Sequence, residues 1–192
     1  VDGNQRHWQL STIERAVDAE GLTLIGWRDV PIDPGSIGHI ARAAMPQFRQ
    51  IFIGAPGGLD QNAFERKLYV LRRVIEKAME ARGAYFHVPS LSSRTFLFKG
   101  MFLAHQTPEF FPDLQDTDIE SRVALVHQRY STNTFPTWEL AQPFRYLAHN
   151  GEINTIRGNQ NWMNAREGTL RSNLFGEDLK KLVRLGEEMA GV

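Results

Sequence analysis

The longest regular pattern of hydrophobic positions in this sequence lies between residues 60 and 82. Apolar residues recur there at spacings of four, three, four and four, which places them on one face of an α-helix. They are Phe64, Leu68, Leu71, Ile75 and Met79. We therefore expect a helix over Asp60–Arg82 that ends at Gly83. Four basic residues fall away from this stripe, and we expect them on a solvated face. They are Lys67, Arg72, Arg73 and Lys77.

Shorter patterns predict further helices and strands. The capping-box spacing of Ser11 and Glu14 predicts a helix that begins at Ser11 and ends at Gly21. Short apolar runs predict strands over 22–28, 48–53, 85–88, 95–99 and 122–128. Helices are also expected over 37–44, 159–170 (with Asn159 as its cap) and 177–185, and an acidic loop over 108–118. Strands and helices mix without strict βαβ alternation, so we expect the α+β class.

The amino-acid composition restricts the kinds of partner and location expected for this protein. The 22 basic and 22 acidic residues cancel, which argues against nucleic acid or an anionic membrane as the main partner. No apolar run approaches the length of a membrane span, and no signal-peptide pattern opens the chain. The absence of cysteine excludes disulfides and thiolate metal sites and fits a reducing cytoplasm. The chain starts on Val1, and its last residues follow a helical pattern without a closing element. We therefore expect an interior piece of a longer polypeptide: one partial domain over 1–192, with no second domain.

The first candidate binding residue is Arg129. It ends the strand expected over 122–128, where a guanidinium group can bind both oxygens of a carboxylate. The alternative is a structural role, in a buried salt bridge with Asp116, Asp118 or Glu120.

The dipeptide Asn150-Gly151 is the second candidate. Glycine lets a backbone N–H point into a site without a side chain in the way, and the asparagine amide supplies a second donor. Together they can hold a tetrahedral oxyanion, where the loss of one donor costs about 3 kcal/mol. The alternative is a tight hairpin turn, because Asn-Gly is also the commonest sequence for such turns.

Other polar residues give weaker signals. His127 and His149 are 22 residues apart, and no third ligand at short offset accompanies them, so we predict structural histidines and no metal site. Ser131, Thr132 and Thr134 have nucleophilic hydroxyl groups, but none has a recognisable neighbouring base.

Taken together, the residues from His127 to Trp162 resemble one known family. HQRYSTNTFPTWELAQPFRYLAHNGEIN followed by RGNQNWM closely resembles the glutaminase domain of the glutamate synthase large subunit, which is a class II glutamine amidotransferase. GWRDVPID, LYVLRRVIEKA, SLSSRT and FKGMF precede it in the family's order. HNGEIN alone is common to class II amidotransferases. The preceding segment HQRYSTNTFPTW favours the glutamate synthase type over the glucosamine or asparagine types of class II amidotransferase.

The resemblance implies a fold and a division of roles. The fold would be part of an N-terminal-nucleophile hydrolase αββα sandwich, truncated at both ends. Arg129 would bind the α-carboxylate of glutamine, while Asn150 and the Gly151 N–H would form the oxyanion hole. Residues 131–138 would belong to the loop that covers the glutamine pocket. The family's nucleophile is a cysteine at the mature N-terminus, which this sequence lacks, so we expect the isolated chain to be inactive.

The resemblance also implies what the parent protein does. Ammonia from glutamine would pass through an internal tunnel to a synthase site and join 2-oxoglutarate. FMN and an iron–sulfur cluster would belong to later domains, and electrons would come from a nicotinamide-using small subunit or from ferredoxin. This chain itself would bind no cofactor. The alternative hypothesis is a cysteine-free module that binds glutamine or assists assembly without catalysis.

Overall fold

The computed structural model describes residues 3–130, 135–145, 147–148 and 156–183. The chain divides into two compact units, each made of separate stretches of sequence. The first unit contains residues 1–24, 53–93 and 153–192, and the second contains residues 25–52 and 94–152. Among the residues that the structure describes, no helix combines the length and the apolar character needed to cross a membrane.

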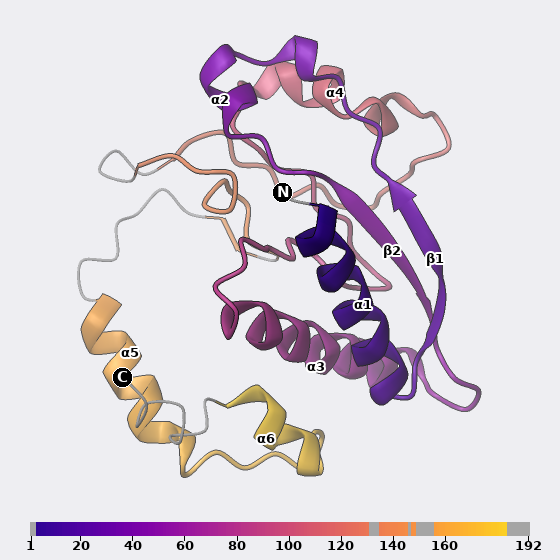
Figure 1. Ribbon diagram of the computed structural model, residues 1–192, viewed down its shortest axis with the longest axis vertical. Coiled ribbons are helices and arrows are strands. Elements are labelled where there is room, and N and C mark those ends of the chain that lie inside the picture. The colour runs from indigo at the N-terminus through magenta and orange to yellow at the C-terminus, as the bar shows by residue number, and fades with distance from the viewer. Residues whose placement is uncertain (1–2, 131–134, 146, 149–155, 184–192) are drawn as a thin grey trace. The chain divides into compact units, whose positions relative to one another are not determined.

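Two long helices form the centre of the first unit. Helix α1 (Gly3–Ala19) packs against helix α3 (Gln61–Glu80), as Figure 1 shows. Asp60 caps α3 by accepting a hydrogen bond from the Ala63 N–H at 2.8 Å, and Gly83 follows the helix with a φ of +61°. The predicted helix is therefore confirmed, with its bounds shifted by one or two residues. Its buried side chains include most of the predicted stripe.

The basic face of α3 is not the solvated face that we expected. Arg72 is buried, pairs with Glu76 at 2.8 Å and lies over the ring of Tyr69. Lys77 donates to the backbone carbonyl of Val183. The expectation was wrong because the C-terminal segment packs on this side of the helix. The periodicity of α3 alone carries no information about a segment about a hundred residues away.

Helix α1 begins earlier than the capping box predicted. Ser11 lies in the middle of the helix rather than at its start. Trp8 stacks against the guanidinium group of Arg82 at 4.6 Å, and the Gln9 amide donates to the Tyr85 carbonyl at 3.3 Å. These tertiary contacts stabilise the extra turns. The predicted end is confirmed, since Gly21 has a left-handed φ of +69°.

The C-terminal segment of the first unit, residues 156–183 of the described chain, consists of short helices and turns. Helix α5 (Ile156–Glu167) starts before Asn159, so the predicted cap at that residue is wrong. The turn η4 (Gly176–Asp178) leads into helix α6 (Leu179–Leu182), which contacts α3. Lys67 and Lys181 each pair with both Glu20 and Asp178 at distances between 2.8 and 3.5 Å. This network joins α6 to α1 and α3.

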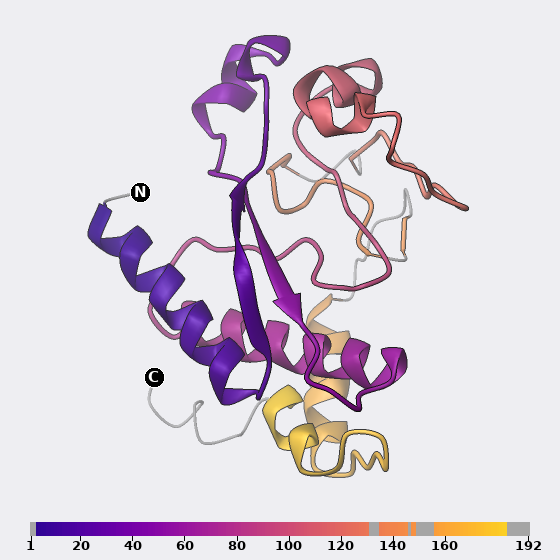
Figure 2. The same ribbon diagram turned by 90° about the vertical axis from the view of Figure 1, so that its right-hand side faces the viewer.

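A two-stranded sheet is formed by β1 (Thr23–Asp29) and β2 (Arg49–Gly54). The Val30 N–H donates to the Phe48 carbonyl at 3.3 Å, so the end of one strand lies beside the start of the other. The strands are therefore antiparallel, as Figure 2 shows. The turn η1 (Pro34–Ser36) and helix α2 (His39–Ala43) connect them.

The core of the second unit is aromatic. Its fully enclosed members are Ile37, Ala41, Phe110, Phe111 and Trp138. Phe110 and Phe111 belong to a run of short helices: η2 (Ala104–Gln106), α4 (Thr107–Phe110) and η3 (Pro112–Gln115). The acidic loop expected over 108–118 was therefore partly wrong, because its two phenylalanines drive it into the core.

Three predicted strands are absent from the part of the chain that the structure describes. Residues 85–88, 95–99 and 122–128 form no strand there, and Val123 and Val126 are 80% and 81% exposed. Apolar residues predict a strand, but a strand also needs a neighbour for its backbone hydrogen bonds. What the structure shows is a mixture of helices with one small sheet. The sandwich remains a prediction.

Candidate functional site

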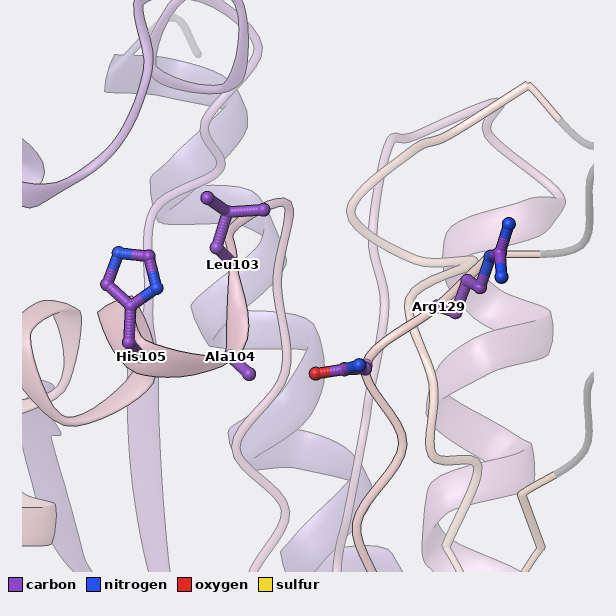
Figure 3. Close-up of a pocket in the computed structure, with 5 residues that line it drawn as sticks. Leu103, Ala104, His105 and Arg129 are labelled. Carbon is purple, nitrogen blue, oxygen red and sulfur yellow. The ribbon is translucent and has the colours of Figure 1, made fainter.

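Arg129 lines a cavity of about 300 Å³ in the second unit. The other lining residues are Leu103, Ala104 and His105, around the start of η2, and the neighbouring Gln128. In Figure 3, the guanidinium group of Arg129 extends away from Leu103 and His105. The cavity is thus lined by apolar and imidazole side chains and by Arg129, whose guanidinium group is directed away from them.

Arg129 is exposed in the described structure. Its backbone N–H donates to the Nδ1 atom of His127 at 3.1 Å. In the described structure, no ion pair joins it to Asp116, Asp118 or Glu120. The buried salt bridge that we considered is therefore absent from the described residues, and the carboxylate-binding role of Arg129 stays a prediction.

Tyr130, next to Arg129, anchors the stretch of chain that follows Arg129 and contains the described residues 135–145. Its hydroxyl group donates to the backbone carbonyl of Thr137 at 2.8 Å. Burial and, to a smaller extent, the negative charge of Glu139 raise the pKa of Tyr130 to about 12. The hydroxyl group therefore stays protonated at neutral pH and keeps its hydrogen bond.

Lys99 is the residue near this stretch that the sequence analysis missed. It is buried, its ammonium group donates to the Glu139 carbonyl at 2.7 Å, and it lies over the ring of Phe144 at 4.7 Å. Burial and, to a smaller extent, the positive charge of Arg145 lower its pKa to about 8, against the opposing effect of the Glu139 carboxylate. The available signal was a lysine inside the apolar run FKGMF, a pattern that also fits an exposed strand residue.

Trp138 sits at the point where this stretch enters the core. Its indole Nε1 donates to the Ala41 carbonyl at 3.1 Å, and its side chain is 5% exposed. Gly100 lies in the same core, close against the rings of Trp138 and Phe102. The close packing explains why this position has no side chain.

The other half of the predicted site lies outside the described residues. Asn150 and Gly151 belong to 149–155, so their predicted oxyanion role stays a prediction. The same holds for His149 and for the hydroxyl residues Ser131, Thr132 and Thr134. Among the described residues, no three histidine or carboxylate side chains are grouped so that they could hold a metal ion.

Comparison with known families identifies the class of this protein. Residues 1–190 match the family model of the class II glutamine amidotransferases. The chain belongs to this family. Within it, the chain is 49% identical over 185 residues to the glutamate synthase [NADPH] large chain of Bacillus subtilis, and the alignment covers 94% of this chain and 12% of that protein.

Two further relatives show how widely the similarity extends. The ferredoxin-dependent glutamate synthase 2 of Arabidopsis thaliana is 43% identical over 173 residues, which is 89% of this chain and 11% of that protein. The glutamate synthase [NADH] of Saccharomyces cerevisiae is 40% identical over 172 residues, with 87% and 8% covered. The chain thus spans about a tenth of the length of the relatives that it matches. The resemblance found in the sequence, glutamate synthase within the class II amidotransferases, is confirmed.

Proposed function

We propose that this chain supplies the glutamine-binding part of a glutaminase domain in a glutamate synthase. Arg129 would bind the α-carboxylate of glutamine, and Asn150 with the Gly151 N–H would stabilise the tetrahedral oxyanion. The observation that supports this best is that Arg129 lines a cavity with an exposed side chain, which forms no ion pair with a carboxylate among the described residues. Its position within the region that matches the amidotransferase family supports glutamine as the ligand of that cation.

The nucleophile would come from outside this sequence. The sequence contains no cysteine, and the expected nucleophile is an N-terminal cysteine whose own α-amino group acts as the base. The amine would take the thiol proton while the sulfur attacks the side-chain amide carbon of glutamine. Collapse of the tetrahedral intermediate would release ammonia and leave a thioester, which water would hydrolyse to glutamate. The isolated chain would therefore not hydrolyse glutamine.

The remaining steps would belong to other parts of the polypeptide. Iron–sulfur clusters are held by cysteine thiolates, and none is present in this sequence, so this chain does not fit such a cluster. We place FMN, the cluster and the amination of 2-oxoglutarate in later domains. The relatives are named for three different electron donors, so we infer that this region does not select between a nicotinamide-using subunit and ferredoxin. The cytoplasmic location stays a prediction.

The test is Arg129→Ala in the polypeptide extended upstream to its cysteine. Loss of a charge-assisted fork should weaken glutamine binding by roughly 2–4 kcal/mol, seen as a KM raised 30-fold or more at similar kcat. Arg122→Ala, an exposed arginine on the same segment, is the matched control and should leave KM unchanged. An unchanged KM in Arg129→Ala would show that Arg129 is structural. Glutamine binding without hydrolysis by the extended wild-type protein would favour the non-catalytic module instead.

A further inference from the structure

Three charged residues are buried among those that the structure describes: Glu20, Arg72 and Lys99. Glu20 and Arg72 belong to the first unit and have carboxylate or ammonium partners there. Lys99 is the one in the second unit, the unit that contains Arg129. Its hydrogen-bond partner is a neutral backbone carbonyl rather than a carboxylate. Burying a lysine whose hydrogen-bond partner is a neutral carbonyl costs free energy. The burial of Lys99 therefore needs an explanation.

The partner of Lys99 lies on the stretch of chain that joins the two halves of the proposed site. Arg129 and Asn150 are 21 residues apart in the sequence. Between them, the described residues show three anchors: the Tyr130 hydroxyl on Thr137, the Trp138 indole on Ala41, and the Lys99 ammonium on Glu139. These anchors cluster on three consecutive residues, 137–139. Lys99 is the anchor that brings a charge.

We propose that Lys99 is a positioning residue for the glutamine site. Its ammonium group fixes the backbone at Glu139 and thereby holds Thr137, whose carbonyl accepts the hydrogen bond that anchors Tyr130 beside Arg129. The inference rests on the proposed function. A charge-assisted hydrogen bond is about twice as strong as a neutral one, and the face of Phe144 adds a cation–π contact. Without the ammonium group, the hydrogen bond from Lys99 to the Glu139 carbonyl is lost and residues 137–139 have one anchor fewer.

The expected signature is a change in KM without a change in kcat. A protein whose binding arrangement is populated only part of the time binds its ligand more weakly by that fraction. Saturating glutamine restores the arrangement, so turnover at saturation recovers. If Lys99 merely stabilised the fold, its replacement would lower the unfolding temperature and the amount of active enzyme. The KM of the folded fraction would stay unchanged.

The experiment compares Lys99 variants in the complete polypeptide that contains this sequence, with glutamine hydrolysis as the assay. Lys99→Met keeps the length and apolar stem of the side chain and should raise the KM for glutamine about tenfold, with kcat within about twofold of wild type. Lys99→Arg keeps the charge and should recover most of the loss. Lys180→Met is the matched control, because Lys180 is exposed and pairs only with Glu177 among the described residues. Its KM should equal that of wild type.

The possible outcomes separate the two proposals. Hydrolysis by wild type with an unchanged KM in Lys99→Met overturns the role of Lys99 and leaves the proposed function intact. An equal fall in kcat with no change in KM also overturns it. No hydrolysis by the wild-type polypeptide overturns both. If Lys99→Met yields no folded protein, Lys99→Gln, which keeps a donor without the charge, is judged by the same KM criterion.

Discussion

Replacing Gly100 by alanine tests the packing of the aromatic core directly. A Cβ atom at this position would lie 2.5 Å from the Cζ3 atom of Trp138 and 2.9 Å from Cδ1 of Phe102, with Cε1 of Phe102 nearer still. Ordinary contacts begin at 3.4 Å, so the Trp138 ring would have to move by about 0.9 Å. The φ of Gly100 is not in the left-handed region, so the clash is steric rather than a backbone strain.

The neighbours of these rings leave little room for such a movement. The Trp138 ring makes an edge contact with Phe48 at 5.6 Å and lies 5.7 Å from the ring of Phe110, which is fully buried. Overpacking of a core costs about 1–3 kcal/mol. A displaced Trp138 would also lose its hydrogen bond to Ala41, which adds about 1 kcal/mol. We therefore expect Gly100→Ala to lower the free energy of unfolding by about 3 kcal/mol.

Urea unfolding of the chain, followed by tryptophan fluorescence, measures this loss. Gly26→Ala is the matched control, because a Cβ atom at Gly26 in β1 meets nothing within 4 Å and its φ is also ordinary. It should change the free energy of unfolding by less than about 0.5 kcal/mol. If Gly100→Ala is as stable as Gly26→Ala, the close approach of Trp138 and Phe102 to Gly100 is not a feature of the folded protein.

Further predictions concern the first unit and the oxyanion. Leu71→Ala should cost about 2–5 kcal/mol in urea unfolding, because Leu71 is fully buried, whereas Leu174→Ala, at an exposed leucine, should cost little. Hydrogen bonds from Lys181 and, to a smaller extent, from Lys67 lower the pKa of Asp178. Its ion pairs therefore stabilise the fold above the unfolded pKa and lose this effect as the pH falls through the folded pKa. Asp178→Asn should therefore cost roughly 1 kcal/mol at pH 7, and the difference from wild type should vanish in acid; a constant difference in unfolding free energy would contradict the ion-pair role. In the extended polypeptide, Asn150→Ala should cut kcat about a hundredfold at similar KM, and a change in KM alone would move Asn150 out of the oxyanion hole.

The local signals in this sequence determined the elements that depend on near neighbours. The apolar spacing within 60–82 and the stop at Gly83 lie within a few turns of one another, and the structure has both. The strands at β1 and β2 are also local, since the turn and the short helix α2 bring them together. The family could be identified from the sequence because HQRYSTNTFPTW and HNGEIN closely resemble motifs of that family.

Tertiary structure decided everything that depends on a distant partner. The extra turns of α1 need Arg82 and Tyr85, and the burial of the α3 arginine depends on contacts around it that periodicity does not encode. The predicted strand at 122–128 lacks a hydrogen-bonding neighbour among the described residues, so its apolar pattern alone did not make it a strand. The sequence pattern of Lys99 fits an ordinary exposed strand lysine. Its burial depends on contacts with Glu139 and Phe144, which lie 40 and 45 residues later in the chain. A sequence states which residues are apolar or charged, whereas burial and pairing arise only when segments far apart in the chain meet.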